Sequence, residues 1–174
     1  MTISLCSEGI TVNKLAVMMS FRPEWCQKIL SGEKLIEIRK TIPDLPIPFT
    51  VYMYQCKYDN KPDSGMVVGQ FVVDWIADCK DIPGKCFHEL SGMSTKEWLK
   101  YTENHKGFVY ALHISDLEVY NTPKSISVFR KKCIYPDPAL CLWCPHYNNI
   151  TCLNYWHRAP QSWGYVNDDY SFEF

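Results

Sequence analysis

Hydroxyl and charged side chains are concentrated in one stretch near the N-terminus, residues 17–40, whose sequence is VMMSFRPEWCQKILSGEKLIEIRK. Arginine and lysine donate charge-assisted hydrogen bonds to phosphate and carboxylate groups. Glutamate can orient an arginine or accept a hydrogen bond from the amino group of a base. The stretch therefore has the chemistry of a site for an anionic or base-like ligand. Its candidate binding residues are Ser20, Arg22, Lys28, Lys34, Glu37, Arg39 and Lys40.

A short helix is expected to position the first of these side chains. Residues 17–19 form an apolar run of strand length, and Pro23 suits the first position of the helix that follows, because it has no N–H to leave unpaired. Gly32 ends the helix. Arg22 and the helix N-terminus together could bind a phosphate or a carboxylate. The apolar stripe of this helix is Trp25, Cys26, Ile29 and Leu30.

The second strand of the stretch, residues 34–40, alternates in polarity. Ile36 and Ile38 share one face, whereas Glu37 and Arg39 share the other. In one interpretation the apolar face packs and the charged face meets a ligand. In the other, this is an ordinary amphipathic strand with a Glu–Arg pair in solvent. The spacing alone does not separate the two interpretations.

A second region, residues 158–166 (RAPQSWGYV), offers hydrogen-bonding and stacking groups near the C-terminus. Gln161 could read the polar edge of a base, and a base stacked on Trp163 would gain on the order of 1–3 kcal/mol. Alternatively, Trp163 and Tyr165 alternate into the core of the fold. Gln161, Ser162 and Trp163 complete the candidate binding set.

The segments SFRPEW (residues 20–25) and ILSGEKLIEIRK (residues 29–40) resemble the signature of ASCH domains, a branch of the PUA-like proteins. The GEKxxExRK pattern is the specific part, and the resemblance extends from about Leu15 to Val166. It implies an α+β fold, namely a β-pseudobarrel with flanking helices and a cleft between residues 20–40 and 158–166. It also implies binding of RNA, single-stranded nucleic acid or a modified nucleotide. Some family members are implicated as ribonucleases or as deacylases of acetylated cytidine.

Enzymatic activity has less support in these residues. The deacylase branch of the family pairs a lysine with a threonine nucleophile three residues later; Lys34 fits the lysine, but Glu37 stands at the threonine position. A carboxylate does not replace an activated hydroxyl in acyl transfer, so amidohydrolase activity is disfavoured. A ribonuclease could recruit Lys34 with Ser20 or Ser162, although no base–nucleophile pair is evident. If the chain is an enzyme, the catalytic candidates are Lys34, Glu37 and Ser20.

Cysteine spacing near the C-terminus indicates a metal site. Two cysteines three positions apart can place both sulfurs on one metal, and here a Cys-Leu-Trp-Cys knuckle has a further cysteine seven intervening residues away on each side. The segment is rich in proline and lacks helix or strand periodicity, so it has few apolar contacts to offset its ordering entropy. A structural zinc would fix this loop without an open position for chemistry. The expected ligands are Cys133, Cys141, Cys144 and Cys152.

Alternatives to this zinc site remain open. His146 or His157 would replace a cysteine that is not a ligand, an iron–sulfur cluster is less favoured, and Cys133 or Cys152 could be a small buried hydrophobe. We expect the remaining cysteines to be reduced and buried. They are Cys6, Cys26, Cys56, Cys79 and Cys86.

Length and charge limit the class of protein. With 174 residues, 47% of them apolar, we expect a single domain over residues 1–174, with a cysteine-rich insertion at about 130–157. Lys and Arg total 18 against 19 Asp and Glu, so a nucleic-acid site must be local. The sequence shows no secretory signal and no run long enough to cross a bilayer, which favours a cytoplasmic protein with no membrane partner.

Other elements follow from local patterns. Strands are expected at residues 49–56, 66–76 and 108–114, because these are rich in aromatic and β-branched residues. Gly69 marks a bulge or a close approach of two backbones. A capping box at Ser94 and Glu97 predicts a helix over about residues 95–103.

Three functions are compatible with these patterns. The first is a module that binds RNA, single-stranded nucleic acid or a modified nucleotide, and it is the one we favour. The second is a hydrolase, ribonuclease or nucleoside deacylase acting in the same cleft. The third is a protein-interaction module in transcription or RNA metabolism, with the cysteine-rich loop as its docking surface.

Overall fold

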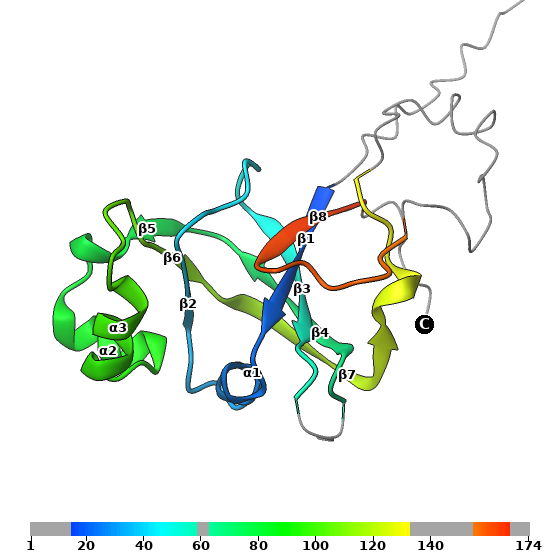
Figure 1. Cartoon of the computed structure of the whole chain (residues 1–174), viewed down its shortest axis with the longest axis horizontal. Coiled ribbons are helices and arrows are strands. Elements are labelled where there is room, and N and C mark those ends of the chain that lie inside the picture. The colour runs from blue at the N-terminus through cyan, green and yellow to red at the C-terminus, as the bar shows by residue number, and fades with distance from the viewer. Residues whose placement is uncertain (1–14, 59–62, 133–154, 168–174) are drawn as a thin grey trace, which may run out of the picture.

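The computed structural model describes residues 15–58, 63–132 and 155–167, whose strands are hydrogen-bonded as two sheets. The first sheet contains β1 (Leu15–Phe21), β3 (Phe49–Gln55), β4 (Met66–Val73), β7 (Ser115–Ser125) and β8 (Trp163–Asn167). The second contains β2 (Ile36–Arg39), β5 (Ile76–Asp78) and β6 (Tyr110–His113). Their strand orders are β7-β4-β3-β1-β8 and β2-β6-β5 (Figure 1).

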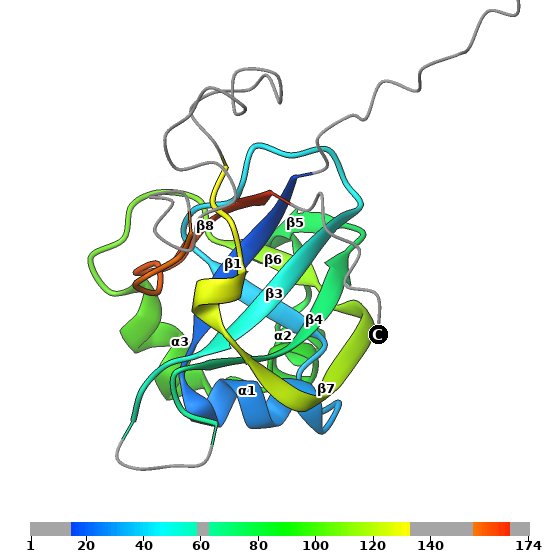
Figure 2. The ribbon, with the colours of Figure 1, turned by 90° about the vertical axis from the view of Figure 1, so that its right-hand side faces the viewer.

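The helices sit at two places around these sheets. They are α1 (Pro23–Leu30), α2 (Gly84–Ser91) and α3 (Thr95–Thr102), with short 3-10 turns η1 (Cys79–Asp81) and η2 (Ile126–Val128). The pair α2 and α3 lies beside the three-stranded sheet, at the left in Figure 1. Helix α1 crosses the lower end of the five-stranded sheet in Figure 2. The mixed five-stranded sheet, the antiparallel three-stranded sheet and the helices together confirm the predicted α+β fold.

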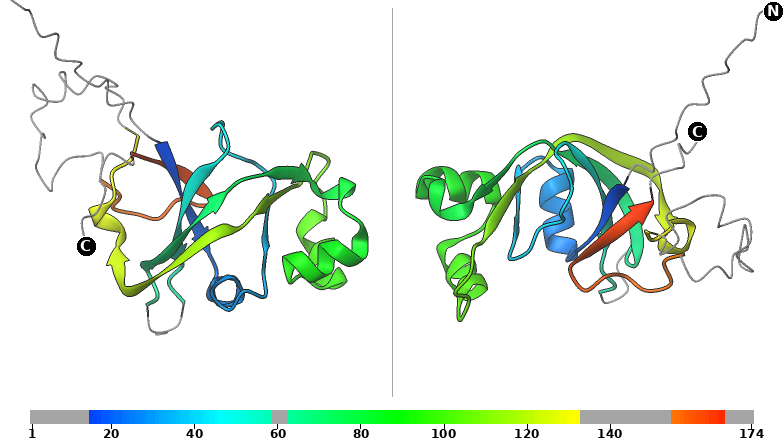
Figure 3. Two further views of the ribbon diagram at one scale, coloured as in Figure 1. Left: turned by 180° about the vertical axis from the view of Figure 1, so that it is seen from behind. Right: turned by 90° about the horizontal axis from the view of Figure 1, so that it is seen from above.

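Strand β1 is central to the five-stranded sheet. It pairs in parallel with β3 and antiparallel with β8, which is why β8 runs alongside it in Figure 3. Val17, Met18 and Met19 are fully buried, because core residues cover both faces of the strand. This explains why β1 is a continuous apolar run and not an alternating one.

Three apolar clusters hold the fold together. The largest joins both sheets to α1 and contains Phe21, Ile29 and Leu112. A second lies between β2 and the α2–α3 pair, where Ile36 and Phe87 are buried. The third covers the other face of the five-stranded sheet and includes Met18, Tyr52, Phe129 and Trp156. The alternation of residues 34–40 therefore places Ile36 and Ile38 against the helices, as predicted for an apolar packing face.

The local predictions that rested on proline, glycine or helix-capping residues agree with the structure. Helix α1 begins at Pro23, and Gly32 beyond its end has a φ of 77°, a conformation that glycine adopts without strain. Both hydrogen bonds of the Ser94–Glu97 capping box are formed. At Gly69 a Cβ would lie 2.5 Å from the carbonyl oxygen of Glu118, which confirms a close approach of β4 and β7.

Some boundaries and burial predictions were wrong. The strand expected at residues 66–76 is divided into β4 and β5, which belong to different sheets. Cys26 and Cys79 are buried and Cys56 is partly buried, but Cys86 is exposed on α2, where Phe87 and Ser91 form the buried face. Within the described ranges, no helix is long and apolar enough to span a membrane.

Candidate functional site

Glu37 is a buried carboxylate held between two cations. One of its oxygens lies 3.4 Å from Lys34 Nζ and the other lies 2.9 Å from Arg39 Nε. The Arg39 contact has an ion-pair distance without hydrogen-bond geometry at Nε. The side chains of Lys34 and Glu37 are only 2% and 9% exposed, so this charged group is largely removed from water. An isolated charge at this depth would be costly, and the three groups offset that cost for one another.

Lys34 is anchored by the end of helix α2. Its ammonium group donates to the carbonyl oxygen of Ser91 over 2.9 Å, while Lys28 Nζ donates to the carbonyl oxygen of Gly92 over 2.6 Å. Both ammonium groups also lie about 5 Å from the ring of Trp25. A helix C-terminus presents unpaired carbonyl groups and partial negative charge, so two lysines are favourable there.

Burial dominates the electrostatics of Lys34. Desolvation lowers the pKa of its ammonium group, and the carboxylate of Glu37 opposes that shift. The carboxylate of Glu37 therefore offsets part of the cost of burying the charge of Lys34.

Arg39 connects β2 to two distant segments of the chain. Its Nη2 donates to the carbonyl oxygen of Ser20 over 2.9 Å, and its Nη1 donates to Ser162 Oγ over 3.2 Å. The guanidinium group also lies 5.1 Å from the ring of Phe21. The Arg39 side chain is 12% exposed and is therefore partly accessible to solvent.

Ser20 joins the same two segments through its own groups. Its Oγ donates to the carbonyl oxygen of Pro160 over 2.6 Å, and its backbone N–H donates to the carbonyl oxygen of Ser162 over 3.0 Å. We call the meeting point of Ser20, Arg39, Pro160 and Ser162 the Arg39 junction. It brings residues 20–40 and 158–166 together, as the resemblance to ASCH domains implied.

The remaining candidate side chains surround the junction less closely. Arg22 is 76% exposed and makes a long 4.0 Å contact with Glu24. Lys40 lies 4.8 Å from the ring of Tyr101, and Gln161 is exposed. Of the five candidate cations, Arg39 is at the junction and Lys28 and Lys34 are at the end of α2, whereas Arg22 and Lys40 make neither set of contacts.

Trp163 and Tyr165 use their polar atoms within the protein. Trp163 Nε1 donates to the carbonyl oxygen and to Oγ1 of Thr41, and the Tyr165 hydroxyl accepts from the N–H of Asp44. Trp163 also packs against the main core cluster. The two rings therefore hold the loop after β2 in place. This agrees better with the alternative that Trp163 and Tyr165 pack in the protein than with the alternative that they stack on a base.

Two thiols close to the site are poorly suited to act as nucleophiles. Burial raises the pKa of Cys26, and the nearby Glu37 carboxylate raises it further. Burial also raises the pKa of Cys56, although Arg39 and Arg22 partly oppose this shift. Both thiols are therefore protonated near neutral pH, whereas the thiolate is the reactive form.

The four predicted zinc ligands, Cys133, Cys141, Cys144 and Cys152, lie outside the described residues, as does His146. Across residues 15–58, 63–132 and 155–167 there is no group of three or more His, Cys, Asp or Glu that could hold a metal. The ends of the cysteine-rich segment are described and lie side by side. Arg130 and Tyr155 form an antiparallel bridge, and Arg130 Nε donates to the Tyr155 hydroxyl over 3.1 Å.

Sequence reasoning did not identify three partners of the site. The carbonyl oxygens of Ser91 and Gly92 bind the two lysines, and Thr41 binds Trp163. A backbone carbonyl has no side-chain signature, so the two α2 contacts had no signal in the sequence. The alternation of residues 34–40 could not show that Lys34 is buried.

The mixed five-stranded sheet, the antiparallel three-stranded sheet and the strand–helix–strand unit of β1, α1 and β2 form an ASCH-like α+β fold. No family model matches the sequence, and no curated protein matches it. The structure is similar to the ASCH protein of Zymomonas mobilis, with a TM-score of 0.60, 16% identity and coverage of 88% of this chain and 89% of that chain.

Two point mutants of the Zymomonas mobilis protein ZmASCH give the same result. The serine-to-alanine mutant matches with a TM-score of 0.61 and 15% identity, over 90% of this chain and 92% of that chain. The tyrosine-to-phenylalanine mutant matches with a TM-score of 0.59 and 15% identity, over 88% of this chain and 91% of that chain. The predicted resemblance to ASCH domains is thus confirmed at the level of the fold.

Proposed function

We propose that this protein binds RNA, or a similar single-stranded or modified nucleotide ligand, at the Arg39 junction. The ASCH-like fold supports nucleic-acid binding in general, because ASCH domains are associated with RNA binding and hydrolysis. We interpret the two sheets and their shared core as the pseudobarrel that the resemblance implies. The binding surface is then the region where residues 20–40 meet residues 158–166.

The geometry of Arg39 is the observation that carries this proposal. A guanidinium group has five N–H donors in a fixed plane. The bonds to Ser20 and Ser162 take one donor from each terminal nitrogen, and the described residues supply no further hydrogen bond to either nitrogen. One N–H on each terminal nitrogen is thus left to a ligand. A guanidinium held in this way is suited to phosphate, because little side-chain entropy is lost on binding.

Exposed cations next to the junction supply the long-range attraction. Arg22 follows Ser20 closely in the chain, and Arg158 precedes Pro160 in the same way; both side chains are exposed. With a net charge of −1 for the whole chain, such a local arrangement is needed to attract a polyanion.

The arrangement of Lys34 favours binding over acyl transfer. A lysine acting as a base or nucleophile needs a neutral amine and access to the substrate. Here the ammonium group is buried against the Ser91 carbonyl oxygen and the Glu37 carboxylate. We propose that Lys34 fixes Glu37, that Glu37 in turn fixes Arg39, and that Lys28 stabilises the end of α2.

We also propose a structural zinc on Cys133, Cys141, Cys144 and Cys152, with His146 or His157 as the replacement ligand. The proposal rests on the spacing of the cysteines. It is supported by the adjacent ends of the segment, because the Arg130–Tyr155 bridge closes the loop that the metal would stabilise.

Fluorescence anisotropy with a labelled single-stranded RNA tests the binding proposal. We expect saturable binding by the wild-type protein and at least about tenfold weaker binding by the Arg22→Glu/Arg158→Glu double variant, because several phosphate contacts act together. Lys85→Glu is the matched control, since Lys85 is an exposed lysine on α2 outside the junction. Equal affinities of all three proteins would contradict the proposal. Intact RNA after incubation would favour a binding module, whereas cleavage by wild type alone would favour the hydrolase alternative.

A further inference from the structure

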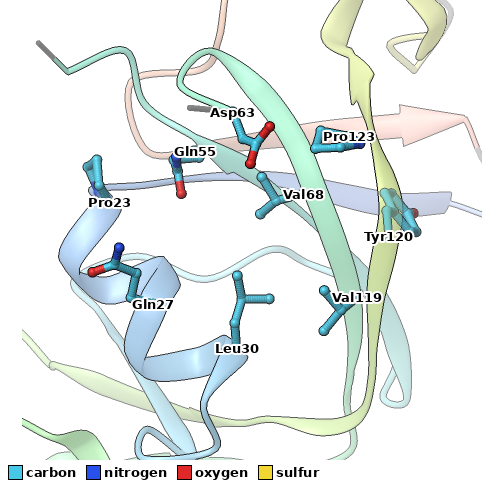
Figure 4. A pocket seen from close by; sticks show the side chains of 9 residues that line it. All are labelled: Pro23, Gln27, Leu30, Gln55, Asp63, Val68, Val119, Tyr120 and Pro123. Atoms are coloured by element: carbon cyan, nitrogen blue, oxygen red, sulfur yellow. The ribbon is translucent and has the colours of Figure 1, made fainter. Parts of the chain in front are cut away.

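A second candidate ligand site lies between helix α1 and strands β4 and β7. Its open pocket of about 280 Å³ is lined by residues of α1, the end of β3, the turn before β4, and strands β4 and β7 (Figure 4). It shares no lining residue with the Arg39 junction. The residues around it are Pro23, Gln27, Leu30, Gln55, Asp63, Val68, Val119, Tyr120 and Pro123.

The walls of the pocket are apolar. In Figure 4, Leu30 extends from the helix toward the space between Val68 and Val119, which come from the two strands opposite. Protein pockets that bind small molecules have volumes from about 300 Å³ upward, so this one is near the lower limit. Its size suits a single ring system and excludes a large ligand.

Besides the Tyr120 hydroxyl, which donates to Gln70, the lining has three polar side chains. Gln27 lies on α1, Gln55 ends β3, and Asp63 stands in the turn before β4, with all three side chains around the same end of the space in Figure 4. Gln55 is only 8% exposed. The turn is fixed by two backbone bonds, from the N–H of Gly65 to the carbonyl oxygen of Gln55 and from that of Met66 to the carbonyl oxygen of Asp63.

The charge of the lining selects the ligand. It contains one carboxylate and two carboxamides, and neither lysine, arginine nor histidine. A phosphate or carboxylate would therefore be repelled. The carboxylate accepts hydrogen bonds from an amino group, and a carboxamide both donates to and accepts from the edge of a base. A flat, uncharged heterocycle with an amino group matches these three side chains.

We propose that this pocket binds one amino-bearing nucleobase, of the adenine or cytosine class. The base could belong to a free nucleoside or to the strand held at the Arg39 junction; for the second source the inference rests on the proposed function. The two places are close along the chain. Phe21, whose ring lies beside Arg39, is paired in register with Gln55, and the exposed Arg22 precedes Pro23 of the pocket.

Titration with adenosine, cytidine and uridine, followed by isothermal calorimetry or amide chemical shifts, tests this proposal. We expect adenosine or cytidine to bind at least tenfold more tightly than uridine, which has no amino group. Val119→Trp fills the pocket and should abolish this binding. Val128→Trp is the matched control, because Val119 and Val128 are 51% and 46% exposed and only Val119 lines the pocket. Gln27→Leu, on the exposed side of α1, should weaken nucleoside binding without affecting the fold.

The proposal is overturned if wild type binds no nucleoside, if uridine binds as well as adenosine and cytidine, or if Val119→Trp binds as wild type does. RNA titrations separate the two sources of the base: weaker RNA binding by Val119→Trp indicates a base of the bound strand, and unchanged RNA binding indicates a free nucleoside. They also separate this inference from the proposed function. If Val119→Trp loses nucleoside binding, the pocket proposal is supported. If the Arg22→Glu/Arg158→Glu variant also binds RNA as tightly as wild type does, RNA binding at the Arg39 junction is refuted while the pocket proposal stands.

Discussion

Arg39 and Ser162 lie 123 positions apart in the sequence, yet Nη1 of the arginine donates a hydrogen bond to Oγ of the serine over 3.2 Å. This contact exists because β8 pairs with β1 and brings the preceding residues over the end of β2. Arg39 therefore connects two distant segments of the chain, and under the proposed function it also donates to an anionic ligand. A conservative substitution tests both roles.

Arg39→Lys should keep the positive charge but lose the planar set of donors. Lysine cannot reproduce the simultaneous bonds to Ser20 and Ser162. We expect a loss of about 1–3 kcal/mol of folding free energy and weaker RNA binding. Denaturant unfolding and anisotropy titration measure the two effects, with Lys85→Arg as the control. Wild-type values in both assays would mean that the planar geometry of Arg39 has no role.

Lys34 and Glu37 should be strongly coupled. Glu37→Gln leaves two buried cations without a carboxylate and should cost on the order of 3–5 kcal/mol, whereas Lys34→Met leaves Glu37 paired with Arg39 and should cost less. The Lys34→Met/Glu37→Gln double variant should lose about 1–3 kcal/mol less free energy of unfolding than the sum of the losses in the two single variants. Denaturant unfolding of all four proteins gives this coupling energy. Additive costs would show that the ion pair contributes nothing specific.

Lys34 should also give the stability a characteristic pH dependence. Burial lowers the pKa of its ammonium group below the ordinary value of 10.5. Between the lowered value and 10.5 the unfolded chain binds more protons than the folded one, so stability rises with pH in that window. Below the window both states are protonated, and the cost of burying the charge is constant.

The difference in melting temperature between wild type and Lys34→Met isolates this effect, since other groups cancel. We expect the difference to shift in favour of wild type as the pH rises from about 8 to 11. Lys85→Met, at an exposed position, should show no such trend. A difference that shifts against wild type over this range would mean that the pKa of Lys34 is raised.

Removal of metal should destabilise the protein if the cysteine-rich segment holds zinc. We expect one zinc per chain by elemental analysis, and its loss together with a lower melting temperature in Cys141→Ser or after treatment with a chelator. Cys86→Ser, which alters an exposed cysteine of α2, is the control and should retain the metal. A folded protein free of metal as purified would end the zinc proposal.

The elements with local signals could be predicted from the sequence. Pro23 and Gly32 fixed both ends of α1, and the Ser94–Glu97 capping box fixed the start of α3. Helix α2 was not predicted, because its N-terminus follows Pro83 and has no side-chain cap. A helix stabilised mainly by burial of Phe87 against β2 carries little information in its own sequence.

The candidate site was predictable only in part. The alternation of residues 34–40 correctly separated Ile36 from Glu37, since side chains of a strand alternate between its two faces. It could not show that the face carrying Glu37 is also buried. That outcome depends on α2, whose last carbonyl groups bind Lys34 and Lys28, and on the pairing of β8 with β1. Contacts at such long sequence separation leave no local pattern.

Photochemical crosslinking of the wild-type protein to a single-stranded RNA containing 4-thiouridine, followed by mass spectrometry of the peptides, most directly tests whether RNA binds at the Arg39 junction. We predict crosslinks within residues 20–40 and 155–167, on both sides of Arg39. Crosslinks confined to other segments, or a failure of the RNA to crosslink at all under conditions of saturable binding by a known RNA-binding control, would contradict the account.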